Sequence, residues 1–171
     1  MKNEAGLSPT IKIAAVAILT AVTALFTFVR VPFAPTRGYF NLSDVAIFFS
    51  ALTIGPFTAL LAGGLGTALA DIISGYPQWA PISFVVHGLQ GLVIGLLARR
   101  GGLLNLSMGA VAGTVTMCTG YLLGGWLMVG LVAALAEVPI NLLQNLAGII
   151  GGVSLHLAVK KAYPPITGIS W

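Results

Sequence analysis

A row of polar side chains interrupts an apolar stretch in the last third of the chain. Glu137, Asn141, Gln144 and Asn145 lie at spacings that place them on one face of a helix. Polar groups are costly at membrane depth unless they face a protein interior or a watery cavity. We therefore expect a polar cavity in which Glu137 and Asn141 contact a ligand. The alternative is a ladder of interhelical hydrogen bonds that only fixes packing.

A second polar pair precedes this row in the sequence. His87 and Gln90 are three residues apart in an apolar segment, so they share a helix face and can meet Glu137 and Asn141 across the cavity. His87 alone would be a packing histidine, whereas together with the row it becomes a candidate ligand contact. His156 lies near the other end of its segment without polar company, and we expect it at the membrane interface.

Two aromatic side chains lie in the segment Ser74–Ala80, where a glycine and a proline shape a turn. Tyrosine and tryptophan collect at membrane interfaces without any ligand. Alternatively, Tyr76 and Trp79 cover a pocket and stack on a planar ligand. Asp71, just before this turn, is expected to have a structural role. Further candidates for ligand contact are Tyr39, Asn41, Tyr121 and Trp126.

Other kinds of chemistry lack the residues they need. The spacing of the two histidines, Cys118 and the acidic residues brings no three metal ligands together, so no metal site is expected. A single cysteine excludes an internal disulfide. No nucleotide-binding P-loop is present, so any ATP chemistry must come from partner proteins. We expect neither a cofactor nor an enzymatic activity.

The composition is that of an integral membrane protein. The chain has 171 residues, of which 57% are hydrophobic and 7% are charged, whereas soluble domains contain roughly 25% charged residues. At about 20 residues per transmembrane helix, we expect one all-α domain of six transmembrane helices over residues 1–171. The net charge of +4 is better explained by membrane topology than by nucleic-acid binding.

Apolar lengths and Gly or Pro breakers predict where the six helices lie. The second is too short to cross a membrane core of about 30 Å alone, and the segment Pro32–Leu42 is expected to cover its outer end. Small residues four apart, such as Gly148 and Gly152, are expected to pack helices closely. The predicted helices are Ser8–Val31, Ser43–Ile54, Pro56–Ile73, Pro81–Ala98, Leu103–Val129 and Leu131–Lys160.

Basic residues predict the orientation in the cell membrane. With both termini in the cytoplasm, six lysines and arginines lie inside and two lie outside, which satisfies the positive-inside rule. The inner group is Lys2, Lys12, Arg99, Arg100, Lys160 and Lys161, and the outer group is Arg30 and Arg37.

The arrangement of these features resembles the S components of energy-coupling factor (ECF) vitamin transporters. The resemblance rests on the polar segment Gly38–Asp44 before a short helix, the Gly55-Pro56 turn, and a Gly-rich helix that ends in Asp71 before a gating loop. It covers nearly the whole chain. It implies an S-component-like bundle that binds a vitamin outside the cell and delivers it to the cytoplasm.

The resemblance also implies partners. Ala17 and Ala21 match the Ala-x-x-x-Ala motif with which S components pack against a transmembrane coupling subunit, and two ATPase subunits would complete the transporter. Metal-capturing relatives have a histidine immediately after Met1, where this chain has Lys2.

The Gly38–Asp44 and Ala70–Pro77 segments look most like S components for thiamine-pyrimidine precursors, pyridoxine-like vitamins or riboflavin. The polar residues favour a small neutral or weakly basic heterocycle, because Glu137 accepts from a ring amine and amides read ring nitrogens. A diacid such as folate would need cationic partners, and only Arg30 and Arg37 are expected on the outer side.

Two other functions fit the residues. The chain could be a small exporter that works alone, with Glu137 as its proton-coupled site. Such a protein would transport without ATPases. The chain would otherwise be a membrane assembly protein with no small ligand, in which the polar row matters for folding alone.

Overall fold

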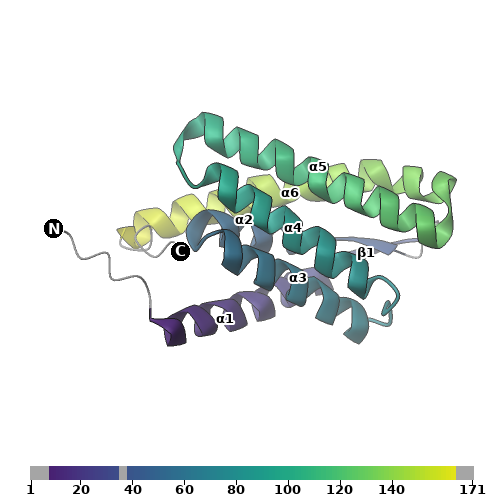
Figure 1. Cartoon of the computed structure of the whole chain (residues 1–171), viewed down its shortest axis with the longest axis horizontal. Helices are drawn as coiled ribbons and strands as arrows, with labels where there is room; N and C mark the ends of the chain where they lie inside the picture. Colours follow the sequence, from purple (N-terminus) through teal and green to yellow (C-terminus); the bar gives the residue numbers. More distant parts are fainter. Residues whose placement is uncertain (1–7, 35–37, 165–171) are drawn as a thin grey trace.

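A computed structural model describes residues 8–34 and 38–164, and these residues form a bundle of six helices with one β-hairpin (Figure 1). Within this part of the chain, five helices are long and apolar enough to cross a membrane, and α2 is shorter. The predicted all-α membrane fold is thereby confirmed. The helices are α1 (Pro9–Phe28), α2 (Ser43–Thr53), α3 (Pro56–Ile73), α4 (Ala80–Ala98), α5 (Gly102–Val129) and α6 (Leu131–Ala162).

Local signals explain most of the helix ends. Ser8 caps α1 by accepting a hydrogen bond of 3.4 Å from the Ile11 backbone nitrogen, and Pro9 takes the first helical position. Between α2 and α3, Gly55 adopts a φ of 132°, which side-chain-bearing residues rarely adopt, and Pro56 then starts α3. Because such breakers are local, five of the six predicted helices agree with the observed bounds to within two residues.

The segment after α1 differs from the expected open loop. The α1 helix ends at Phe28 rather than Val31, because a strand, β1 (Arg30–Phe33), begins there and pairs antiparallel with β2 (Gly38–Asn41). Arg30 lies opposite Asn41 in this pairing. In Figure 1 β1 runs along the long axis of the bundle beyond α2, at the end where the cover was expected.

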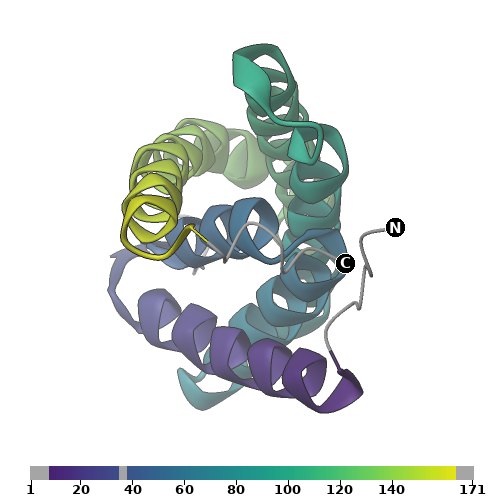
Figure 2. The ribbon, with the colours of Figure 1, turned by 90° about the vertical axis from the view of Figure 1, so that its left-hand side faces the viewer.

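The short helix α2 forms the centre of the molecule. It packs against α1, α3, α4 and α6, and seen from the end of the bundle it lies among them (Figure 2). Ile47 and Phe48 are completely buried and join Ala59 of α3 and Ile94 of α4 in the main apolar core. Its 11 residues span about 16 Å, so the hairpin and the helix ends around it enclose the space beyond its N-terminus.

Close helix approach depends on the predicted glycine pairs. A Cβ atom on Gly148 would lie 2.3 Å from the Asp44 Cβ, and one on Gly152 would lie 2.4 Å from the Phe48 Cβ. The absence of these side chains allows the α6 backbone to approach α2 closely. The packing role predicted for this pair is confirmed.

The bundle has two chemically different ends. The hairpin, the α3–α4 turn and the α5–α6 turn share one end, and the α2–α3 turn, the α4–α5 turn and the end of α6 share the other. Arg30 lies at the hairpin end, whereas Arg99, Arg100, Lys160 and Lys161 lie at the opposite end. Lys2 and Arg37, which entered the orientation count, lie outside the described residues.

Candidate substrate site

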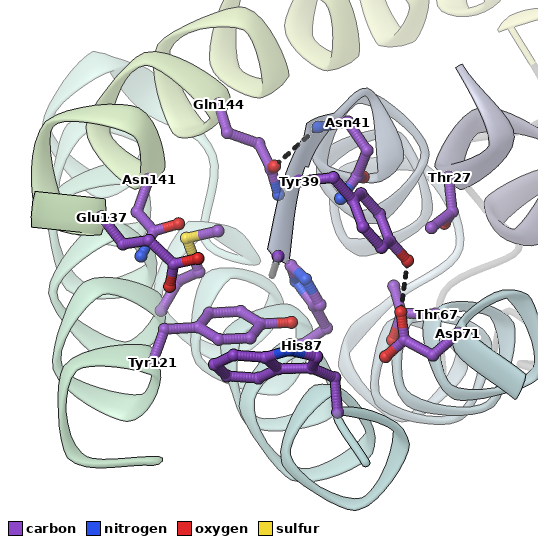
Figure 3. A pocket seen from close by; sticks show the side chains of 13 residues that line it. Thr27, Tyr39, Asn41, Thr67, Asp71, His87, Tyr121, Glu137, Asn141 and Gln144 are labelled. Atoms are coloured by element: carbon purple, nitrogen blue, oxygen red, sulfur yellow. Dashed lines mark hydrogen bonds between the residues drawn. The ribbon is translucent and has the colours of Figure 1, made fainter. Parts of the chain in front are cut away.

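A polar pocket lies at the hairpin end of the bundle, under β2 (Figure 3). Its free volume is about 30 Å³, which is enough for one or two water molecules. Every helix except α2 contributes to its lining. The lining residues are Thr27, Gly38, Tyr39, Asn41, Thr67, Asp71, Trp79, His87, Met117, Tyr121, Glu137, Asn141 and Gln144.

The polar row of α6 forms one wall of this pocket. Glu137 and Asn141 are 7% and 8% exposed, and Gln144 is 2% exposed, so the helix turns this face inward as its periodicity predicts. Within the described part of the chain, nothing accepts a hydrogen bond from the buried Asn141 amide nitrogen. A buried donor without a partner is uncommon and is free to bind a ligand acceptor.

Aromatic rings form the neighbouring wall. Trp79 is 4% exposed, and its ring centroid lies 6.0 Å from that of Tyr121. The Tyr121 ring in turn meets the His87 imidazole edge to face at 5.4 Å, while its hydroxyl bonds Ser83 at 2.7 Å. These contacts hold flat apolar surfaces opposite the amides and carboxylate of α6, an arrangement suited to a planar heterocycle.

The hairpin is held against the α3 end of the pocket by polar and aromatic contacts. The Tyr39 hydroxyl donates a hydrogen bond to the Asp71 carboxylate, and Arg30 donates one to the Ser74 hydroxyl. Burial, followed by the charge of Asp71, raises the pKa of the Tyr39 phenol, so the hydroxyl keeps its proton at neutral pH. The Tyr39 and Tyr76 rings meet edge to face at 5.1 Å, with the Arg30 guanidinium 5.4 Å and 5.8 Å from their centroids.

Asn41 connects the hairpin to two helices. Its backbone nitrogen donates to Gln144 Oε1 at 2.9 Å, and its side-chain oxygen accepts from the Ser43 backbone nitrogen at 2.7 Å. The second bond lies at the start of α2, where Leu42 is the N-cap. The Asn41 oxygen is therefore already engaged at the pocket edge.

A buried polar network lies beneath the pocket and contains Gln90. The Gln90 amide nitrogen donates to Asp44 at 2.7 Å and to Asn145 at 2.9 Å, and its oxygen lies 2.8 Å from His87 Nδ1. Asn145 also donates to the Met117 sulfur at 2.7 Å. Of the predicted pair on α4, only His87 reaches the pocket lining, and Gln90 instead supports it from below.

Two other predicted contacts need correction. Trp126 is 53% exposed on α5 and does not line the pocket, because its position on the helix places it on the outside of the bundle. Tyr76 lies behind Tyr39 rather than at the lining. His156, at the other end, bonds Thr53 at 3.1 Å.

Several lining residues were not among the predicted contacts. Gln144 belongs to the recognised polar row, so periodicity alone would have included it. Asp71, expected to be structural, both holds Tyr39 and lines the pocket. Thr27, Thr67 and Met117 carry no signal in the sequence that separates them from ordinary membrane-helix residues. Among the described residues, no three His, Cys, Asp or Glu side chains converge as metal ligands would.

Comparison with known proteins identifies the family. Residues 8–161 match the family model described as the ECF-type riboflavin transporter, S component. The chain belongs to this S-component family. The S-component chain is thus a multi-pass membrane protein of a vitamin-uptake system, as its apolar helices also indicate.

Two relatives of this S component are informative. The thiamine precursor transporter HmpT of Lactococcus lactis is 31% identical over 144 residues, which cover 81% of each chain. An uncharacterized protein of Pyrococcus woesei, described by its position in a gap 3' region, is 36% identical over 149 residues. That match covers 85% of this chain and 99% of the relative.

Proposed function

We propose that this S component captures a small planar vitamin or vitamin precursor outside the cell and delivers it to the cytoplasm. A hydroxymethylpyrimidine, another thiamine-related compound or a pyridoxine-like compound is the favoured substrate, and riboflavin comes next. The similarity to a thiamine precursor transporter supports the first of these. The match to a riboflavin-transporter family model supports keeping the last.

The unpartnered amide nitrogen of Asn141 is the observation that carries this proposal. It would donate to a ring nitrogen or carbonyl of the substrate, while the Glu137 carboxylate nearby would accept from an amine or hydroxyl. Trp79 and Tyr121 would contact the flat faces of the ring. A pyrimidine or pyridine with polar substituents can make both the hydrogen bonds and the ring contacts.

Substrate entry requires the hairpin to move. Pockets for drug-sized ligands have volumes of about 300–1,000 Å³, whereas this one has about 30 Å³. The contacts of Tyr39 with Asp71 and of Arg30 with Ser74 join the hairpin to the α3 end. Breaking them would open the pocket, and reforming them over the substrate would exclude water and slow its release.

The coupling partners would bind the exposed face of α1, outside the bundle. Ala17 and Ala21 are exposed, and Ala17 lines a groove of about 490 Å³ between α1 and α3. The other lining residues are Ile13, Val16, Thr20, Leu61 and Leu65. Small and apolar side chains allow close approach of a partner helix in lipid. The partner would be an ECF transmembrane coupling subunit that works with two ATPases.

Calorimetry with the purified chain tests the substrate. Hydroxymethylpyrimidine, thiamine, pyridoxine and riboflavin would be titrated into the wild type and Glu137→Gln, with folding checked by thermal melting. We expect one of these compounds to bind below the high-micromolar range and the variant to bind about tenfold to a hundredfold more weakly. Failure of all four compounds to bind the wild type would contradict the proposal.

Cysteine labelling tests the proposed orientation in the cell membrane. After Cys118 is replaced by Ala, a single cysteine is introduced by Gln78→Cys or by Arg100→Cys, at exposed positions on opposite ends of the bundle. An impermeant reagent should label position 78 in intact cells and leave position 100 unlabelled. The reverse pattern would place the termini outside.

A further inference from the structure

A second cavity lies at the end of the bundle opposite to the hairpin. It has a volume of about 440 Å³, far larger than that of the polar pocket. The ends of α2, α4 and α6 and the beginnings of α3 and α5 surround it. Figure 2 looks onto this end, where α6 and α5 stand apart.

Two cationic side chains line this cavity. Arg99 follows α4, and Lys160 lies near the end of α6, one turn after His156. The bond of 3.1 Å between Thr53 and the His156 Nδ1 fixes the imidazole against the end of α2. None of the acidic residues that the structure describes lines the cavity. The lining therefore carries positive charge without a compensating carboxylate, which favours an anionic ligand.

The rest of the lining is largely apolar. Leu52 and Ile54 come from the end of α2, Leu106 from α5, and Val153 and Leu157 from α6. A free phosphate ion would use only the cationic side chains. An amphipathic anion would use both parts, because its hydrocarbon chain can lie along the leucine and valine side chains.

We propose that this cavity binds an anionic phospholipid. Its phosphate would lie between Arg99 and Lys160, and an acyl chain would follow the apolar side chains between α5 and α6. Basic pockets between transmembrane helices are suited to anionic headgroups. Arg100 and Lys161, the sequence neighbours of these two residues, are exposed but do not line the cavity.

This pairing of neighbours supplies a matched control. Arg99→Gln with Lys160→Gln and Arg100→Gln with Lys161→Gln remove the same charge from adjacent positions, and only the first pair changes the cavity. Native mass spectrometry of the purified chain would measure binding of phosphatidylglycerol and phosphatidylcholine. We expect the wild type and the control pair to prefer phosphatidylglycerol at least tenfold, and the cavity pair to lose this preference.

The variant Val153→Phe and two competing ligands, phosphatidylcholine and inorganic phosphate, test the site in further ways. Val153→Phe should fill the apolar part and weaken phosphatidylglycerol binding at least tenfold while all charges remain, so it tests the site even if the cavity pair does not fold. Vitamin binding at the other end should be unchanged. Equal loss of lipid in both charge pairs would indicate diffuse surface charge and overturn the proposal. Equal binding of phosphatidylcholine, or displacement of the lipid by an equal concentration of inorganic phosphate, would also overturn it.

Discussion

The backbone nitrogen of Asn41 donates a hydrogen bond of 2.9 Å to the side-chain oxygen of Gln144, 103 residues away in the sequence. Asn41 ends the hairpin, and Gln144 belongs to the polar row of α6, so this bond joins the cover of the pocket to its wall. Both residues are buried. Removing the Gln144 acceptor would leave a buried backbone donor without its partner in the closed pocket, which is costly away from water.

Replacing Gln144 should therefore make the closed pocket less stable. In Gln144→Leu the Asn41 nitrogen loses its acceptor, and we expect the vitamin to dissociate faster and to bind about tenfold more weakly. Stopped-flow tryptophan fluorescence and calorimetry would measure both quantities. Asn105→Leu removes an amide at the other end of the bundle and should leave them unchanged. Normal dissociation from Gln144→Leu would show that this bond does not hold the hairpin closed.

The two tryptophans near the hairpin end should differ in their effect on binding. Trp79 is buried at the pocket, whereas Trp126 is exposed on α5. We expect Trp79→Ala to weaken vitamin binding by about tenfold or more through loss of ring contact, and Trp126→Ala to leave it within about twofold. Calorimetry on both variants, with melting curves as a folding control, tests this. Similar affinities for the two folded variants would remove Trp79 from the site.

Gln90 should matter for stability. In Gln90→Leu the Asp44 and Asn145 oxygens lose the amide donor that they share in the interior. We expect a loss of about 2 to 4 kcal/mol in the free energy of unfolding, seen as a lower melting temperature.

A second variant tests the cause of that loss. Because Asp44→Asn removes the buried charge, the double variant Gln90→Leu with Asp44→Asn should be destabilised by less than the sum of the single changes. Strict additivity of the two losses would mean that the bond between Gln90 and Asp44 contributes little.

The exposed face of α1 should be needed for uptake and dispensable for binding. Ala17→Trp fills the groove between α1 and α3, so we expect vitamin uptake in cells to fall at least tenfold while the isolated protein binds normally. Ile18→Trp adds the same side chain at an exposed position outside that groove and should preserve uptake. Loss of binding as well as uptake in Ala17→Trp would mean that this face packs within the subunit.

Much of the architecture follows from the sequence alone. Long apolar runs require helices that satisfy their own backbone hydrogen bonds in lipid, and local breakers such as Gly55-Pro56 end them at definite residues. The periodicity of Glu137, Asn141 and Gln144 determines that they share a face, because side-chain direction repeats with the helical turn. These features depend on neighbours in the chain, so they could be predicted without the tertiary structure.

Contacts between distant segments were decided only by the tertiary structure. The rotation of each helix about its axis and the register between helices determine that Gln90 bonds Asp44 beneath the pocket, that Trp79 lies inside it and that Trp126 lies outside. The cavity beside Arg99 and Lys160 likewise requires segments far apart in the chain to meet. Close packing at Gly148 and Gly152 selects one such arrangement among many that the same apolar helices allow, because the missing side chains at these positions let α2 approach α6.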